Sequence, residues 1–296
     1  MGKSMEWLYD EVTTTILSQI EKGTLPWRKP WSAKGTVPFN PFSKNNYQGV
    51  NFAYLSAVVD AKAYNTPQFA TYKQVNENGG QVRKGEKSSV VCFWKILKRK
   101  RDDDPTKTET FPILRYYRVF NLDQVEGIEP VTVEEELPEH ERDTNAEMFI
   151  ANVGATVHER KQDRAYYSAV QDEIVVPKLE QFESPGSYYA TLLHEHVHWT
   201  AHETRLNREL SKRFGDEAYA AEELVAELGA TMLCAQLQLN PEIEGHASYI
   251  DGWHSVLSRD PKAIFKASTL AKQASEFLTD KQPNVKDDSH DRVLAA

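Results

Sequence analysis

Apolar residues recur at intervals of three and four between residues 4 and 22, which predicts an amphipathic helix that ends before Gly23. Two more helices are expected at 52–63 and 71–78, each after a polar or proline-containing turn. Residues 89–97 and 111–120 are instead rich in Val, Ile and aromatic side chains, and we expect them to pair as strands of a hairpin with a charged, solvated tip. The front of the chain is therefore predicted to be a small α+β unit.

The pattern changes at about residue 125, where the chain becomes acidic and contains prolines, as is typical of a linker. The remainder is predicted to be mostly helical. Its expected elements are a helix at 146–154, a strand pair at 166–169 and 172–177, a helix at 187–205 capped by Ser187, and helices up to residue 280, followed by a disordered tail. We predict two domains, 1–125 and 146–296, joined by an acidic linker at 126–145.

The composition is that of an ordinary globular protein, with 40% hydrophobic and 27% charged residues among 296. The sequence contains no apolar run of membrane-spanning length, and its N-terminus lacks the layout of a signal peptide, so we expect a cytoplasmic protein. Cys92 and Cys234 lie far apart in apolar surroundings and are expected to be buried thiols.

The two parts of the chain differ in charge. Residues 1–123 contain 19 Lys or Arg and 12 Asp or Glu, a net charge of +7, whereas residues 124–296 contain 16 and 32, a net charge of −16. A basic front half suits a polyanionic partner, and the alternative is a solvated basic surface without a partner.

One stretch of the basic half suggests single-stranded nucleic acid as that partner. Trp27 and Trp31 flank Arg28 and Lys29 on a proline-stiffened segment, so that rings can stack on bases while cations hold phosphates. The alternative is that both tryptophans fill the domain core. The candidate contacts are Trp27, Arg28, Lys29, Trp31, Tyr47, Arg83, Lys84 and Lys87.

The predicted helix at 187–205 carries the candidate chemistry. His194 and His198 are four positions apart and point the same way from a helix, so both imidazoles can bind one metal ion. Glu195 follows the first histidine, where a carboxylate can accept a proton from water. This is the H-E-x-x-H pattern of zinc peptidases. Histidines that merely lie on the helix surface or in the core are the alternative.

A catalytic zinc ion usually has three protein ligands and one open position. No histidine follows at the metzincin spacing, because position 204 is Thr204, and His202 lies too far along the helix. A later helical stretch offers Glu223 and Glu227 on one face, and we expect Glu223 as the third ligand and Glu227 behind a histidine. The alternative is that these glutamates only cover a helix face. The strand at 172–177 is expected to be an edge strand that pairs with extended substrate.

Several motifs in order give the chain a resemblance to the ArdC-type antirestriction proteins of conjugative plasmids. The front half is similar to their N-terminal domain, and to that of TraC-type primases, at 26–31 (PWRKPW), 47–51 (YQGVN), 71–74 (TYKQ) and 80–86 (GQVRKGE). The back half resembles their zincin-like domain at 194–200 (HEHVHWT) and 222–228 (EELVAEL). The resemblance covers nearly the whole chain.

The resemblance implies a front half that binds single-stranded DNA, a metallopeptidase fold behind it, and protection of incoming plasmid DNA from host restriction, in the recipient cell of a conjugation. The expected cofactor is Zn²⁺, with another divalent ion such as Mn²⁺ as the alternative. The protein substrate is open, and a component of the restriction system is one candidate. Two rival functions remain: a DNA-coating protein with a structural metal, and a protease that cleaves DNA-bound proteins.

Overall fold

The computed structural model describes residues 5–22, 37–100, 108–131, 142–182, 184–208, 217–239 and 247–283. The elements of the front half, in chain order, are α1 (Glu6–Ile20), β1 (Phe39–Asn40), β2 (Asn45–Asn46), α2 (Val50–Lys62), β3 (Phe69–Thr71), α3 (Tyr72–Glu77), β4 (Gln81–Val82), β5 (Ser89–Lys100), β6 (Thr108–Asn121), η1 (Leu122–Gln124) and β7 (Val125–Glu126). The helices and the hairpin expected here from the sequence are confirmed, with small shifts of their ends.

The back half is mostly helical, as expected. Its elements are α4 (Thr144–Val153), β8 (Thr156–Arg160), β9 (Tyr166–Ser168), β10 (Glu173–Pro177), η2 (Leu179–Gln181), α5 (Pro185–Trp199), α6 (Glu217–Gln236), α7 (Ala247–Arg259) and α8 (Ala263–Thr279). None of the helices described combines the length and apolar character needed to cross a bilayer. The tail beyond residue 283 lies outside the described residues.

The small sheet of the back half corrects one expectation. The strand order is β8-β10-β9, with β10 parallel to β8 and antiparallel to β9. The pairing of β9 with β10 is confirmed, but β10 is the central strand, so the prediction that residues 172–177 form an edge strand is wrong. The sequence did not predict β8, because its residues are mostly polar and it pairs in parallel with β10 across the intervening β9.

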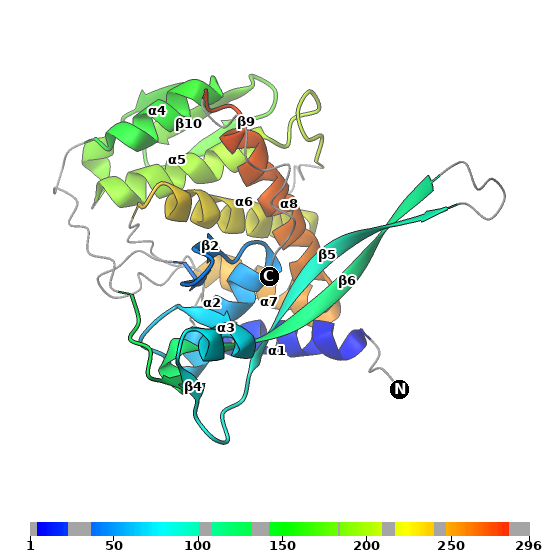
Figure 1. Cartoon of the computed structure of the whole chain (residues 1–296). Coiled ribbons are helices and arrows are strands. Elements are labelled where there is room, and N and C mark those ends of the chain that lie inside the picture. The colour runs from blue at the N-terminus through cyan, green and yellow to red at the C-terminus, as the bar shows by residue number, and fades with distance from the viewer. Residues whose placement is uncertain are drawn as a thin grey trace.

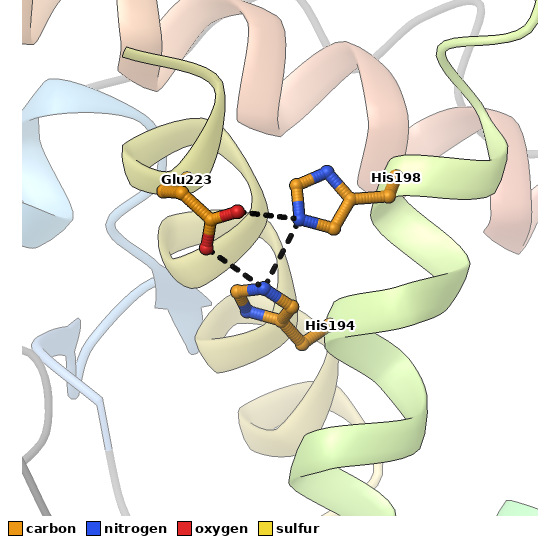
Figure 2. Close-up of side chains that lie close together, drawn as sticks. All are labelled: His194, His198 and Glu223. Atoms are coloured by element: carbon orange, nitrogen blue, oxygen red, sulfur yellow. Dashed lines mark hydrogen bonds and ion pairs between the residues drawn. The ribbon is translucent and has the colours of Figure 1, made fainter. Parts of the chain in front are cut away.

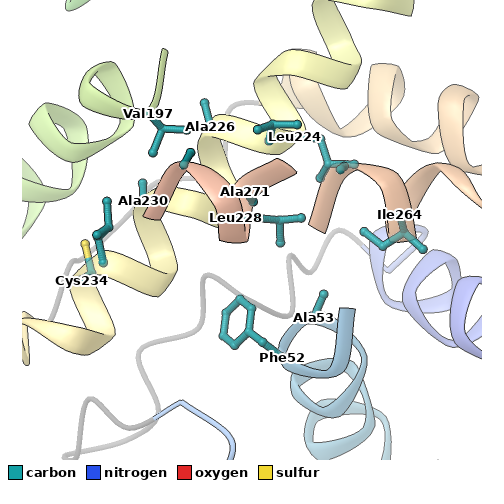
Figure 3. Packing of buried hydrophobic residues seen from close by; sticks show 14 of the residues in the cluster. Phe52, Ala53, Val197, Leu224, Ala226, Leu228, Ala230, Cys234, Ile264 and Ala271 are labelled. Atoms are coloured by element: carbon teal, nitrogen blue, oxygen red, sulfur yellow. The ribbon is translucent and has the colours of Figure 1, made fainter. Parts of the chain in front are cut away.

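One hydrophobic core runs through both halves of the chain. It includes Leu8 of α1, Phe52 of α2, Leu228 of α6 and Ile264 of α8, and Figure 3 shows α2 facing α6 and α8 across this core. The halves also share polar contacts, since Thr13 Oγ1 donates a hydrogen bond of 2.7 Å to the Pro261 carbonyl. Cys92 and Cys234 are free and buried, as expected.

The predicted linker is only partly described. Its first residues are attached to the front half, where the Gln68 side chain pairs with both the N–H and the C=O of Val131. At its other end, Asp143 caps α4 by accepting a hydrogen bond from the Ala146 N–H. Residues 132–141 lie outside the described residues.

Among the residues that the structure describes, the contacts of the β5–β6 hairpin with the core lie at its base. β3 pairs with β6 over three positions, from Asn121 to Val119, and the Asn51 side chain pairs with both the N–H and the C=O of Cys92 at 2.7 Å. Asn51 thus occupies the place of a neighbouring strand along β5 at this point. Beyond it, the two strands extend away from the rest of the described structure (Figure 1).

α5 and α6 approach each other closely at a glycine. A Cβ atom on Gly229 of α6 would lie 2.8 Å from Cγ2 and 3.1 Å from Cγ1 of Val197, which is on α5. Val197 faces the small side chains of α6 and α8 (Figure 3). A larger residue at position 229 would therefore force the two helices apart.

We predict that Gly229→Ala destabilises the protein by about 1–3 kcal/mol through overpacking, even though alanine favours a helix. It should also weaken divalent-metal binding, because His194 and His198 are on α5 and Glu223 is on α6. Chemical denaturation and metal titration measure the two effects.

The matched control is Gly252→Ala on α7, where the added Cβ would meet Ala220 Cβ at an ordinary 3.4 Å. This control should keep or slightly raise stability and leave metal binding unchanged. A Gly229→Ala protein with the stability and metal affinity of the wild type would contradict the close packing seen here.

Candidate metal centre

The helix that carries the histidines begins and ends at well-defined signals. Ser184 caps α5 by accepting a hydrogen bond of 3.2 Å from the Ser187 N–H, and Pro185 occupies the first turn, where its missing N–H costs nothing. The cap is thus Ser184, not Ser187 as predicted. The helix ends at Trp199, so the expectation that it continues to residue 205 is wrong; residues 201–206 form turns.

The second helix brings acidic side chains to the histidines. Glu222, Glu223 and Glu227 of α6 are all buried, each less than 8% exposed, among the apolar residues that pack α6 into the core. Burial of three carboxylates is costly unless each one has a cationic or hydrogen-bonding partner. Their surroundings show how that cost is met.

The structure brings His194, His198 and Glu223 together, as expected from the sequence (Figure 2). His194 Nε2 lies 3.4 Å from Glu223 Oε2, His198 Nε2 lies 3.4 Å from Glu223 Oε1, and the two Nε2 atoms are 3.1 Å apart. One ligand atom from each residue lies within 4.8 Å of the others. Two imidazole nitrogens and a carboxylate oxygen at this spacing fit a divalent ion of the zinc type.

Without a metal ion, the carboxylates of the cluster favour protonation of its histidines. Burial alone would lower the pKa of His194, but the Glu223 and Glu227 carboxylates outweigh burial and raise this pKa to about 10. Burial would raise the pKa of Glu223, yet the two histidines hold it well below its usual range. Because the two Nε2 atoms lie within hydrogen-bond distance of each other, there is room for only one proton between them. A metal ion must displace that proton.

Each candidate histidine ligand has a carboxylate at its other ring nitrogen. Glu227 Oε2 lies 3.7 Å from His194 Nδ1, in the position expected for it. Glu222 Oε1 lies 3.3 Å from His198 Nδ1, a contact that the sequence did not predict. Such partners fix the ring tautomer and leave Nε2 free to bind a metal.

Arg208 completes the outer layer of the cluster. Its guanidinium donates to both oxygens of Glu222, at 2.7 and 3.1 Å, and to Thr200 Oγ1 and the Val197 carbonyl. The Arg208 side chain is only 5% exposed. Burial would raise the pKa of Glu222, but His198 and Arg208 lower it below the usual range. Arg208 therefore both neutralises Glu222 and satisfies carbonyl and hydroxyl groups at the end of α5.

Glu195 is buried next to the cluster, 7% exposed, and burial raises the pKa of its carboxyl group. The backbone of Tyr167 on β9 donates a hydrogen bond to this carboxylate, which opposes the shift. A carboxylate with a raised pKa is a better proton acceptor near neutral pH. The strand beside Glu195 is thus β9, an edge strand of its sheet, and not β10.

A second network holds β9 against α5. Arg205 donates to Asp172 and to the Tyr167 hydroxyl, and its guanidinium lies 3.8 Å from the centre of the Trp199 ring. This pairing lowers the pKa of the Asp172 carboxyl group, first through the hydrogen bond from Arg205. This contact could not be predicted from the sequence, because it depends on the turns after Trp199.

The predicted nucleic-acid contacts have different outcomes. Arg83, Lys84 and Lys87 are exposed. Tyr47 is only 9% exposed, its hydroxyl donates to the Phe69 carbonyl, and burial raises its pKa to about 12. The ring of Tyr47 is therefore not available for stacking, which corrects that expectation. The remaining candidates lie outside the described residues: Trp27, Arg28, Lys29 and Trp31.

Comparison with known proteins agrees with this geometry. A family model described as zincin-like metallopeptidase matches residues 144–270, and one described as the N-terminal domain of anti-restriction factor ArdC matches residues 6–120. The metal-free crystal structure of antirestriction ArdC protein from plasmid R388 is 38% identical, with a TM-score of 0.76, and the alignment covers 93% of this chain and 97% of that one. The chain belongs to the ArdC family of antirestriction proteins.

Other members and relatives extend the ArdC comparison. The Mn(II)-bound structure of R388 ArdC is also 38% identical, with a TM-score of 0.76, over 94% of this chain and 99% of that one. The uncharacterized protein y4eC of Sinorhizobium fredii (strain NBRC 101917 / NGR234) is 38% identical over 92% of this chain and 91% of its own length. The order of an ArdC-type N-terminal domain and a zincin-like domain confirms the expected two-domain α+β class.

One similar protein is much longer than this chain. The DNA primase TraC of Escherichia coli is 34% identical over 297 residues, which cover 94% of this chain but 27% of TraC. The ArdC-family chain thus spans about a quarter of the length of that relative.

We predict that Arg208→Met weakens divalent-metal binding about 10–100-fold, because Glu222 then loses the partner that holds it against His198. Removing one member of a buried ion pair should also cost about 3–5 kcal/mol of stability. Competition with a chromophoric chelator measures the first effect, and chemical denaturation measures the second.

Glu222→Gln tests the same contact with less risk to folding, since glutamine keeps the shape and can still accept from Arg208. Like Arg208→Met, it should weaken metal binding. Lys266→Met, which removes an exposed pair with Asp260 at 2.9 Å, is the matched control and should change neither quantity. Unchanged metal affinity in both Arg208→Met and Glu222→Gln would refute a positioning role for this pair.

Proposed function

We propose that this ArdC-family protein protects incoming plasmid DNA from host restriction by binding it as single strands, and that its zincin-like domain is a metal-dependent peptidase. The observation that carries the second half is the buried cluster of His194, His198 and Glu223 beside Glu195. In this proposal the first three residues are the metal ligands, and Glu227 positions His194.

The donor set suits Zn²⁺, and Mn²⁺ is the alternative because a similar ArdC structure holds Mn(II). A divalent ion bound there polarises a peptide carbonyl and lowers the pKa of water. Glu195 accepts the proton of the attacking water and can return it to the leaving amine, since burial raises the pKa of its carboxyl group. The Tyr167 amide holds this carboxylate in place from β9.

The cluster favours a catalytic site over a structural one. A structural metal site is closed by four protein ligands, and it has no use for a buried acid beside the ion. The residues described bring three ligand groups together, and Glu195 is a buried carboxylate beside them that accepts a hydrogen bond from a backbone amide. The protein substrate is proposed to be a component of the restriction system or another protein bound to the DNA.

Binding of single-stranded DNA is supported by the net charge of +7 on residues 1–123 and by the match to the ArdC N-terminal domain. Lys84 and Lys87 are exposed and able to meet phosphates, whereas the exposed Arg83 already pairs with Glu86 Oε1 at 3.2 Å and donates to the Asp123 carbonyl. The acidic back half would repel DNA, so the polyanion is expected to bind on the front half alone.

The peptidase proposal predicts that Glu195→Gln keeps its metal but loses about 10²–10⁴-fold of any peptide hydrolysis. Plasmid protection against restriction should fall with it when cells carrying each protein receive unmodified plasmid. Metal content of both purified proteins is measured alongside.

Glu203→Gln, an exposed glutamate just beyond the same helix, is the matched control and should protect as the wild type does. If Glu195→Gln retains both metal and full protection, hydrolysis is not part of antirestriction. The non-enzymatic DNA-coating function would then be preferred.

The DNA-binding proposal predicts that the full-length protein binds labelled single strands with an affinity that falls steeply as salt increases, because bound phosphates release counterions. Fluorescence anisotropy at several salt concentrations measures this. Failure to bind, or binding that is indifferent to salt, would exclude the proposal.

A further inference from the structure

Beyond its base, the described part of the β5–β6 hairpin leaves one of its faces largely uncovered, with Phe93 at the start of that face half-buried against the core. The strands stay paired from Ser89 opposite Val119 to Lys100 opposite Thr108, whereas β3 reaches only as far along β6 as Val119. The hairpin extends away from the helices (Figure 1). Two-stranded ribbons are marginally stable by themselves. A long ribbon that projects from the core therefore contributes little to stability, which makes its surface a candidate for binding.

The two faces of this ribbon differ. Residues directly opposite in an antiparallel pair lie on the same face. Cys92 pairs with Tyr116 on one face. The ring centres of Tyr116 and Trp7 of α1 lie 5.2 Å apart in an edge-on contact, so this face packs against α1. On the other face Phe93 pairs with Arg115, and Val91 pairs with Tyr117.

That second face presents aromatic rings and cations together. We define the ribbon face as Phe93, Lys95, Arg115 and Tyr117. The Phe93 and Tyr117 rings touch, with their centres 5.7 Å apart, and Tyr117 is 45% exposed. Lys95 and Arg115 are exposed, and neither forms an ion pair with any side chain that the structure describes.

The charge of the hairpin favours an anionic partner. Residues 89–121 contain eight Lys or Arg and four Asp or Glu, a net charge of +4 in a chain with a net charge of −9. Exposed cations without acidic partners attract phosphates. Exposed rings beside them offer a surface on which unpaired bases stack, whereas the bases of a duplex are already stacked on one another.

We propose that the ribbon face is the surface on which this protein binds single-stranded DNA. Bases stack on the exposed Tyr117 ring, which the half-buried Phe93 supports edge-on, and Lys95 and Arg115 hold the adjacent phosphates. The inference rests on the proposed DNA binding and assigns it a place, which the buried Tyr47 does not provide. An acidic peptide would satisfy the cations but would leave the rings unused.

The test compares two double variants of the full-length protein that each remove one tyrosine and one lysine. Lys95→Ala/Tyr117→Ala alters the ribbon face. Tyr72→Ala/Lys73→Ala is the matched control on α3, where Tyr72 is 49% exposed and Lys73 forms an exposed pair with Glu77. Fluorescence anisotropy with a labelled oligonucleotide single strand is measured at several salt concentrations, and folding is checked by circular dichroism.

The ribbon variant should bind the single strand about 10-fold more weakly or worse, from lost stacking and one lost phosphate contact, with a shallower salt dependence. The control should bind like the wild type. Tyr117→Phe, which keeps the ring, should also bind like the wild type. An unlabelled duplex of the same sequence should compete poorly.

Each other result has a distinct meaning. If the wild type binds and the ribbon variant binds equally well, the ribbon face is not the site, while the proposed DNA binding stands. If both double variants weaken binding equally, or if duplex competes as well as single strand, attraction is diffuse and the ribbon face is again excluded. If the wild type does not bind, both the inference and the proposed DNA binding fail.

Discussion

Three buried carboxylates on one face of α6 impose the central constraint on this structure. Glu222, Glu223 and Glu227 lie in the core, where an unpaired charge would be prohibitive, so every one of them must meet a cation or a hydrogen-bond donor. The partners come from elsewhere in the chain: two histidines from α5 and Arg208 from the turns that follow it. The histidines of the candidate metal site thus offset the charges of Glu223 and Glu227, and Arg208 offsets that of Glu222. A divalent ion adds positive charge where the protein already has an excess of negative charge.

That balance depends on how closely α5 and α6 pack. Gly229 lets the Val197 side chain lie against the α6 backbone, and Val197 is one residue before His198. α8 packs against α6 at the same glycine, where the Ala271 carbonyl oxygen would lie 3.6 Å from a Cβ on Gly229, and the front helices close the same core. The three candidate ligand residues are therefore positioned by helix packing, which suits a site that must keep three ligand atoms within a few ångström of one another, and the turn residue Arg208 holds the carboxylate behind one of them.

The sequence predicted the centre of the site well because its geometry is local. Two histidines four residues apart on a helix face one way in any fold, and the same rule placed Glu223 and Glu227 together. It could not predict Arg208 opposite Glu222, since that contact depends on how the turns after Trp199 fold back. Nor could it place Tyr47, because an aromatic residue near cations in sequence can face either the core or the solvent. β8 was missed for a related reason: it is mostly polar and pairs in parallel with β10 across the intervening β9, so nothing in its own pattern marks it as a strand.

The shared core has a consequence for how the two proposed activities are joined. When two domains meet through a flexible linker, each keeps its own stability and the pair are coupled only by distance. Here α1 and α2 cover apolar residues of α6, α7 and α8, so loosening one half exposes part of the other. We therefore expect the halves to unfold together, so that a ligand bound to either half would raise the free energy of unfolding of the whole chain.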